Sequence, residues 1–166
     1  MVIDVAAVAA NKRSVERVFN EAFNQGDLGV IDELVSPAGL DHQHPDEPDF
    51  AVHLKDVIVA MRTAFPDLHF KITQMIGEGD WVALHSVMTG TNTGPLRGPL
   101  LPPDGPPELP ATGRRIEVPH MHMIRSANGQ GGELLHLMDT FAMLKQLGLI
   151  PAPPPRAAQE PAAAAT

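Results

Sequence analysis

The stretch from Ala111 to Pro151, ATGRRIEVPHMHMIRSANGQGGELLHLMDTFAMLKQLGLIP, decides the fold that this sequence predicts. Its first half predicts a strand over about 115–125, in which alternate side chains share one face. An Asn-Gly turn leads to a second strand at about 133–139. An amphipathic helix over about 140–147 then ends at a glycine. One face of the first strand therefore places two imidazoles in an apolar row: Ile116, Val118, His120, His122 and Ile124.

The residues before this hairpin have helical periodicity first and strand periodicity later. Apolar residues between Val15 and Phe23 predict a first helix that ends at Gly26. Asp27 and Asp49 are placed to cap two further helices. From residue 68 the period changes to two, which predicts two more strands before a proline-rich segment at 95–110. We therefore expect an α+β fold, with helices covering one face of a bent antiparallel sheet and one pocket between them.

Length and composition limit the possible functions. A chain of 166 residues suits one domain, expected over 1–151, and the Ala- and Pro-rich segment 152–166 predicts a disordered tail. There is no apolar run of membrane-spanning length and no basic segment typical of a signal peptide. The absence of cysteine excludes thiolate chemistry and fits a cytoplasmic location. The net charge of −8 disfavours nucleic acid, so a small molecule is the expected partner.

Several short segments resemble the SnoaL-like polyketide cyclase family. They are AFPD at 64–67, GTNTG at 90–94, ATGRR at 111–115 and QLGLIP at 146–151, together with Glu133 and Asp139. The resemblance covers roughly residues 11–151. It implies the cone-shaped fold of the nuclear transport factor 2-like superfamily. It also implies ring closure of a hydrophobic polyketide by intramolecular aldol chemistry without a cofactor, and by analogy a homodimer.

Asp139 is the first candidate for the acid/base group. Its position before a helix also suits a helix cap. The resemblance favours a catalytic role, because the family carries an aspartate here. Similar enzymes sometimes have an acidic residue three positions earlier, where this chain has His136. A β-bulge would exchange the two faces of this strand, so the sequence leaves open which position faces the pocket.

Three further histidines are candidate catalytic residues. His120 and His122 lie where the resemblance implies a catalytic histidine, although they could instead be a core or interface pair. His42 resembles a family element after the second helix, or it could be a solvated loop residue. We expect the substrate to contact Phe19, Trp81, His85, Leu135 and Leu137, with a dimer interface as the alternative for His85.

We expect no metal and no cofactor. The chain has eight histidines, but no His-Glu-x-x-His helix and no carboxylate spaced to complete a ligand set. The leading interpretation is a cofactor-independent cyclase. The alternatives are an epoxide hydrolase, dehydratase or isomerase on the same fold, or a non-catalytic binding module. The proline-rich segment 95–110 is either a lid over the pocket or an inert insertion.

Overall fold

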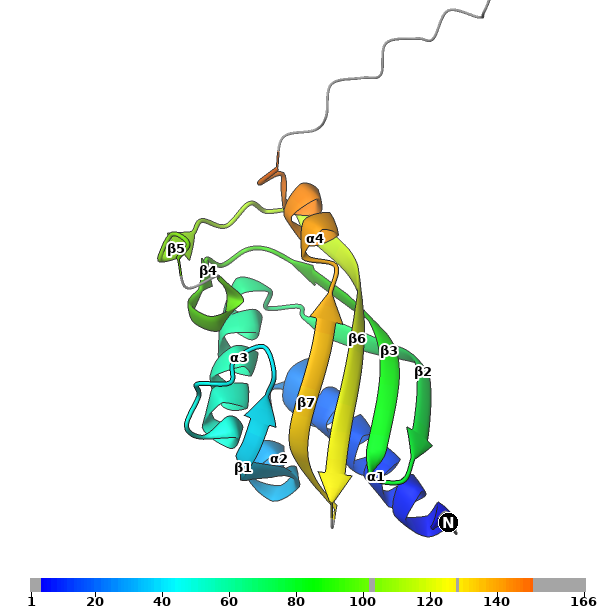
Figure 1. Cartoon of the computed structure of the whole chain (residues 1–166). Helices are drawn as coiled ribbons and strands as arrows, with labels where there is room; N and C mark the ends of the chain where they lie inside the picture. Colours follow the sequence, from blue (N-terminus) through cyan, green and yellow to red (C-terminus); the bar gives the residue numbers. More distant parts are fainter. Residues whose placement is uncertain (1–3, 102–103, 128, 151–166) are drawn as a thin grey trace, which may run out of the picture.

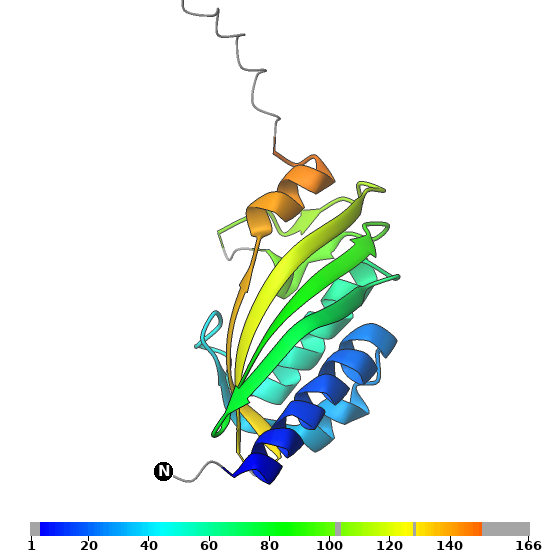
Figure 2. The same cartoon turned by 90° about the vertical axis from the view of Figure 1, so that its right-hand side faces the viewer.

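A curved, five-stranded sheet packs with one face against the two longest helices in the computed structural model, which describes residues 4–101, 104–127 and 129–150 (Figures 1 and 2). The strand order is β1-β7-β6-β3-β2, and only the β1–β7 pair is parallel. The strands are β1 (Val35–Asp41), β2 (His69–Glu78), β3 (Trp81–Thr91), β6 (Arg115–Ala127) and β7 (Gln130–Met138). The predicted α+β class and bent sheet are confirmed. The predicted tail at 152–166 lies outside the described residues.

The helices lie largely where the sequence predicts, with two differences: the first helix begins already at Val5, and Leu28 rather than Asp27 is the N-cap of the second. They are α1 (Val5–Arg17), which continues as a π-helix (Val18–Phe23), then α2 (Gly29–Leu34), α3 (Phe50–Ala64) and α4 (Thr140–Leu147). Gly26 follows the first helix in the left-handed region, with φ +82°. The Asp49 carboxylate accepts the N–H of Val52 at 3.0 Å and so caps α3. Both α1 and α3 lie on the concave side of the sheet (Figure 2).

One extra residue in β7 decides which of its side chains face the helices. Ser126 pairs with Gly131, but Arg125 pairs with Glu133, so Gly132 has no partner in the ladder. Beyond this bulge His136 lies directly opposite His122, and opposite residues share a face of the sheet. Without the bulge, Leu135 would occupy that position. The bulge therefore turns His136 inward.

The proline-rich segment forms part of the wall around the space enclosed by the sheet and the helices. It contains the short strands β4 (Leu96–Arg97) and β5 (Glu108–Leu109) and a 3-10 helix (Gly98–Leu100). Asn92 is fully buried and joins the base of this segment to α3. Its amide donates to the carbonyl of Ala64 at 3.2 Å, and its side-chain oxygen accepts the N–H of Thr112 at 2.8 Å.

We expect Asn92→Ala to lower the free energy of unfolding by about 2–4 kcal/mol, because it leaves several buried polar groups without partners. Urea denaturation measures the difference. Thr93→Ala is the matched control, since the Thr93 side chain is exposed next in the chain. Equal stability of the two variants would contradict the role given to Asn92.

Candidate active site

A cavity of about 520 Å³ lies between the concave face of the sheet, α1, α3 and the 3-10 helix. This volume is in the range of small-molecule sites. The walls are mostly apolar and include Phe19, Leu54, Met61, Met88, Leu96, Leu100 and Ile124. The polar lining is concentrated in one group of side chains: Asp41, Gln43, His44, His120, His122 and His136.

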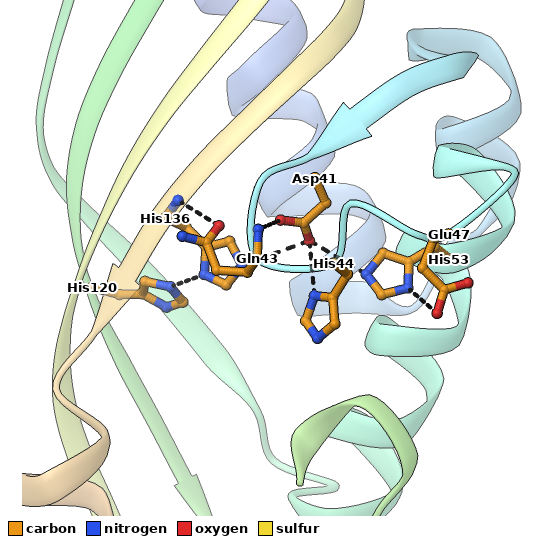
Figure 3. A network of polar contacts seen from close by, with 7 residues as sticks. All are labelled: Asp41, Gln43, His44, Glu47, His53, His120 and His136. Carbon is orange, nitrogen blue, oxygen red and sulfur yellow. Dashed lines mark hydrogen bonds and ion pairs between the residues drawn. The ribbon is translucent and has the colours of Figure 1, made fainter. Parts of the chain in front are cut away.

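Asp41 is the centre of this polar group. It ends β1 and is only 4% exposed. Its Oδ2 lies 3.3 Å from His44 Nδ1, 3.3 Å from His53 Nε2 and 3.7 Å from His136 Nε2 (Figure 3). Its Oδ1 accepts the backbone N–H of Gln43 at 2.9 Å. A loop, α3 and β7 thus each bring one imidazole to a single carboxylate.

The surroundings of Asp41 keep it ionised. Burial alone would raise the pKa of its carboxyl group, but the contacts with His136, the Gln43 N–H and His44 outweigh burial and hold the pKa well below its usual range. An ionised carboxylate only accepts hydrogen bonds. A ring nitrogen that donates to it must therefore carry a hydrogen, which fixes the tautomer of that neutral imidazole.

His120 and His122 extend the polar group along β6. His120 Nε2 lies 3.2 Å from His136 Nδ1, and the His120 and His122 ring centroids are 3.9 Å apart. Burial, with a smaller contribution from His136, lowers the pKa of His120 to about 3. Burial also lowers the pKa of His122 well below 6.5, with His120 and His136 adding to the effect. Both rings are neutral at physiological pH.

The neutral rings leave polar atoms for a ligand. The Nδ1 atoms of His120 and His122 are buried without a hydrogen-bond partner among the described residues. If His136 donates through Nε2 to Asp41, its Nδ1 accepts from His120 Nε2, and His120 Nδ1 is then an acceptor. Buried polar atoms without partners are rare in proteins, and a bound molecule is one explanation for them.

Asp139 does not lie where we expected it. Its side chain is exposed and lies outside the cavity lining, and its Oδ1 accepts the N–H of Ala142 at 2.8 Å at the start of α4. Asp139 is therefore the N-cap of α4, which is the alternative that its place before a helix suggested. The predicted inward positions of Leu135 and Leu137 are also wrong, because the bulge at Gly132 directs Leu134, His136 and Met138 to the cavity instead.

Three other residues predicted to belong to the site also lie outside the cavity lining, so these predictions are wrong. His42 Nε2 contacts Glu133 Oε1 at 2.8 Å and is outside the lining. Trp81 and His85 lie on the face of β3 opposite to its buried residues, and the His85 ring contacts Thr73. Phe19 lines the cavity as expected, with its ring 4.9 Å from that of His122.

The sequence did not single out Asp41, His44 or His53, which the structure brings into contact. Asp41 and His44 lie on either side of His42 in the chain, in a polar run that also suits a solvated loop. His53 gave a usable signal, because it occupies the buried stripe of α3 between Ala51 and Leu54. A histidine at such a position needs a buried partner.

The buried histidines should make stability depend on pH. The unfolded chain binds protons at His120 and His122 below about pH 6.5, whereas folded His120 does so only near pH 3. We therefore expect the free energy of unfolding to fall as the pH drops from 6.5 to 4.5, by about 1.4 kcal/mol per pH unit for each histidine. Urea denaturation of His122→Leu should show a shallower slope than the wild type. His69→Leu, at an exposed position, should leave the slope unchanged, and equal slopes in all three proteins would contradict the assignment.

Comparison with known proteins identifies the family. The sequence profile of the SnoaL-like polyketide cyclases matches residues 13–147. TsrD from Streptomyces laurentii has 21% identity and a TM-score of 0.71, over 90% of this chain and 100% of that chain. IdmH from Streptomyces antibioticus has 27% identity and a TM-score of 0.66, over 83% of this chain and 98% of that chain. AclR from Streptomyces galilaeus has 24% identity and a TM-score of 0.71, over 89% of this chain and 87% of that chain.

Among curated protein sequences none matches this chain. Within residues 4–101, 104–127 and 129–150, no helix has the length and apolar character needed to cross a membrane. The profile match spans most of the chain, and the fold, the cavity and the structural neighbours agree with it. The chain belongs to the SnoaL-like polyketide cyclase family.

Proposed function

We propose that the protein is a cofactor-independent polyketide cyclase that closes a ring by intramolecular aldol addition. The observation that carries this proposal is the ionised Asp41 carboxylate, which holds imidazoles at one part of an otherwise apolar cavity. The family membership supports the same reaction class. IdmH, a neighbour named as a candidate polyketide cyclase, has the same fold.

His44 is the proposed base. Its Nδ1 faces Asp41, so the neutral ring carries hydrogen there and has its lone pair on Nε2. That nitrogen points away from Asp41, and His44 lines the cavity (Figure 3). In the proposed reaction it removes a proton from a carbon between two carbonyl groups. Asp41 orients the ring and stabilises the imidazolium, as the carboxylate does in other carboxylate–histidine pairs.

The second half of the reaction needs a carbonyl acceptor and the return of the proton. The enolate carbon attacks a second carbonyl of the same molecule, and the imidazolium of His44 gives its proton to the alkoxide that results. His122 can donate a hydrogen bond to the accepting carbonyl, whereas His120 Nδ1 suits a hydroxyl of the substrate. His136 acts in positioning, through its contacts with Asp41 and His120.

The shape and charge of the cavity favour an uncharged, hydrophobic substrate of the polyketide type. Among the described residues that line it, none is lysine or arginine, so a free carboxylate would find no cationic partner. An apolar wall that folds a flexible chain so that its reacting carbons meet can supply much of the rate acceleration. A ketonic chain without a free acid meets both conditions.

We expect Asp41→Asn and His44→Gln each to lower the turnover of a linear anthraquinone-type polyketide methyl ester by about 10²–10⁴-fold, because each removes part of the acid/base pair. Product formation is measured with a chelator present throughout. Asp139→Asn is the control, since asparagine also caps a helix and the side chain lies outside the cavity.

Two results would contradict this assignment. Full activity of Asp41→Asn would remove the carboxylate from the mechanism, and a comparable loss in Asp139→Asn would return the role to that residue. Wild-type protein that binds such esters tightly without turnover would be a binding module. Circular dichroism of each variant separates loss of chemistry from loss of fold.

We also propose that the protein is a homodimer that pairs through the outer face of its sheet. Met121 and Met123 of β6 are 48% and 47% exposed, and Leu137 of β7 is 75% exposed. Met121 and Leu137 are partners in the ladder, so they form one apolar surface.

Met121→Glu should shift the protein from dimer to monomer in analytical ultracentrifugation, because it places a charge within this apolar surface. Glu78→Gln, at an exposed position of β2, is the control and should remain dimeric. A monomeric wild type would overturn the proposal.

A further inference from the structure

The contacts around Asp41 Oδ2 are more numerous than hydrogen bonding alone accounts for. A carboxylate oxygen has two lone pairs, yet imidazole nitrogens of His44, His53 and His136 all face this one atom (Figure 3). The separations of 3.3, 3.3 and 3.7 Å also exceed the roughly 2.7–2.9 Å of charge-assisted N–H···O hydrogen bonds. Three donors on one oxygen therefore leave at least one nitrogen poorly satisfied.

The separations of Asp41 Oδ2 from the His44 and His136 nitrogens, 3.3 and 3.7 Å, are close to those of atoms that share a cation. Metal–ligand bonds of about 2.0–2.2 Å place neighbouring ligand atoms about 2.8–3.6 Å apart in octahedral or tetrahedral geometry. Ligand atoms of Asp41, His44 and His136 all lie within 4.8 Å of one another. We infer that Asp41, His44 and His136 form a binding site for a divalent first-row transition metal such as Zn²⁺, Co²⁺ or Fe²⁺.

This arrangement also explains His53. With the metal on one lone pair of Asp41 Oδ2, the other lone pair is available to the Nε2–H of His53, which is 4% exposed. His44 and His136 then bind the metal instead of competing for the oxygen. Every atom around Oδ2 has a partner in this arrangement, which hydrogen bonding alone does not achieve.

Supporting contacts surround the proposed ligands, as is usual at metal sites. His136 Nδ1 lies 3.2 Å from His120 Nε2, and Asp41 Oδ1 accepts the Gln43 N–H at 2.9 Å. His53 is 4% exposed and its Nε2 lies 3.3 Å from Asp41 Oδ2, so it contacts a proposed ligand from the side of α3. These contacts hold the ring and carboxylate orientations that a metal requires.

The position of the site suggests what a bound metal could accept. Two imidazoles and one carboxylate leave coordination positions open, and all three ligands line the cavity. Two neighbouring oxygens of a small molecule, such as those of a 1,3-dicarbonyl compound, could occupy such positions. The inference uses residues of the proposed active site but does not depend on the cyclase reaction, which is proposed to run without metal.

Titration of the untagged, EDTA-treated and desalted full-length protein with Co²⁺ tests the site. We expect visible d–d absorption that saturates at one equivalent per chain and is displaced by Zn²⁺. His44→Ala and His136→Ala should abolish this signal, and His53→Gln should weaken the affinity about 10–100-fold as a residue that supports a ligand. His69→Ala, which removes an exposed histidine of β2, should bind as the wild type does.

Equal Co²⁺ binding by the wild type and His44→Ala would overturn the inference, as would a wild type without saturable absorption. The His44 side chain is 33% exposed, so its removal should leave the fold intact, and circular dichroism checks this. Activity in chelator separates the two proposals. Protein that binds Co²⁺ but does not cyclise in chelator overturns only the proposed function, and protein that cyclises without binding Co²⁺ overturns only the metal site.

Discussion

The interior of this protein is organised around one buried negative charge. A carboxylate that is 4% exposed costs several kcal/mol to remove from water unless donors surround it. Asp41 obtains those donors from elements that are far apart in the sequence: the loop after β1, α3 and β7. The parallel pairing of β1 with β7 brings the end of β1 to the strand that carries His136. At this end of the cavity, the loop after β1, α3 and β7 all contact the same carboxylate.

The cavity combines this charge with two imidazoles that resist protonation. Burial makes His120 and His122 poor bases, so they act as neutral donors or acceptors, while His44 and His136 lie closer to the carboxylate. The same side chain is therefore found in two environments: buried beside apolar groups at His120 and His122, and beside a carboxylate at His44 and His136. An apolar wall from α1, α3 and the segment after β3 surrounds them. The same set of side chains has the composition of a metal site.

The alternation of apolar and polar residues predicted which side chains face inward only in strands whose pairing is regular. It placed His120 and His122 correctly on the inner face of β6, which pairs with β3 without interruption. It failed for β7, because Gly132 adds one residue and exchanges the faces of every residue beyond it. A register shift in β2 between Ile72 and Gln74 likewise leaves Ile76 72% exposed, although regular alternation would place it on the same face as the buried Phe70. Bulges follow from contacts between strands, and a single strand's sequence does not specify them.

Local sequence was enough to predict the α+β class, the helix cap at Asp49, the strand with two inward histidines, and the family. These features depend on local periodicity, on capping and turn chemistry, and on short motifs read in order along the chain. Which carboxylate lines the cavity follows only from the tertiary structure. Asp139 was closest in sequence to the histidines, but it caps α4, whereas Asp41 reaches His136 across 95 positions of the chain through the β1–β7 pairing. Such proximity arises from packing between distant elements, which spacing along a chain does not encode.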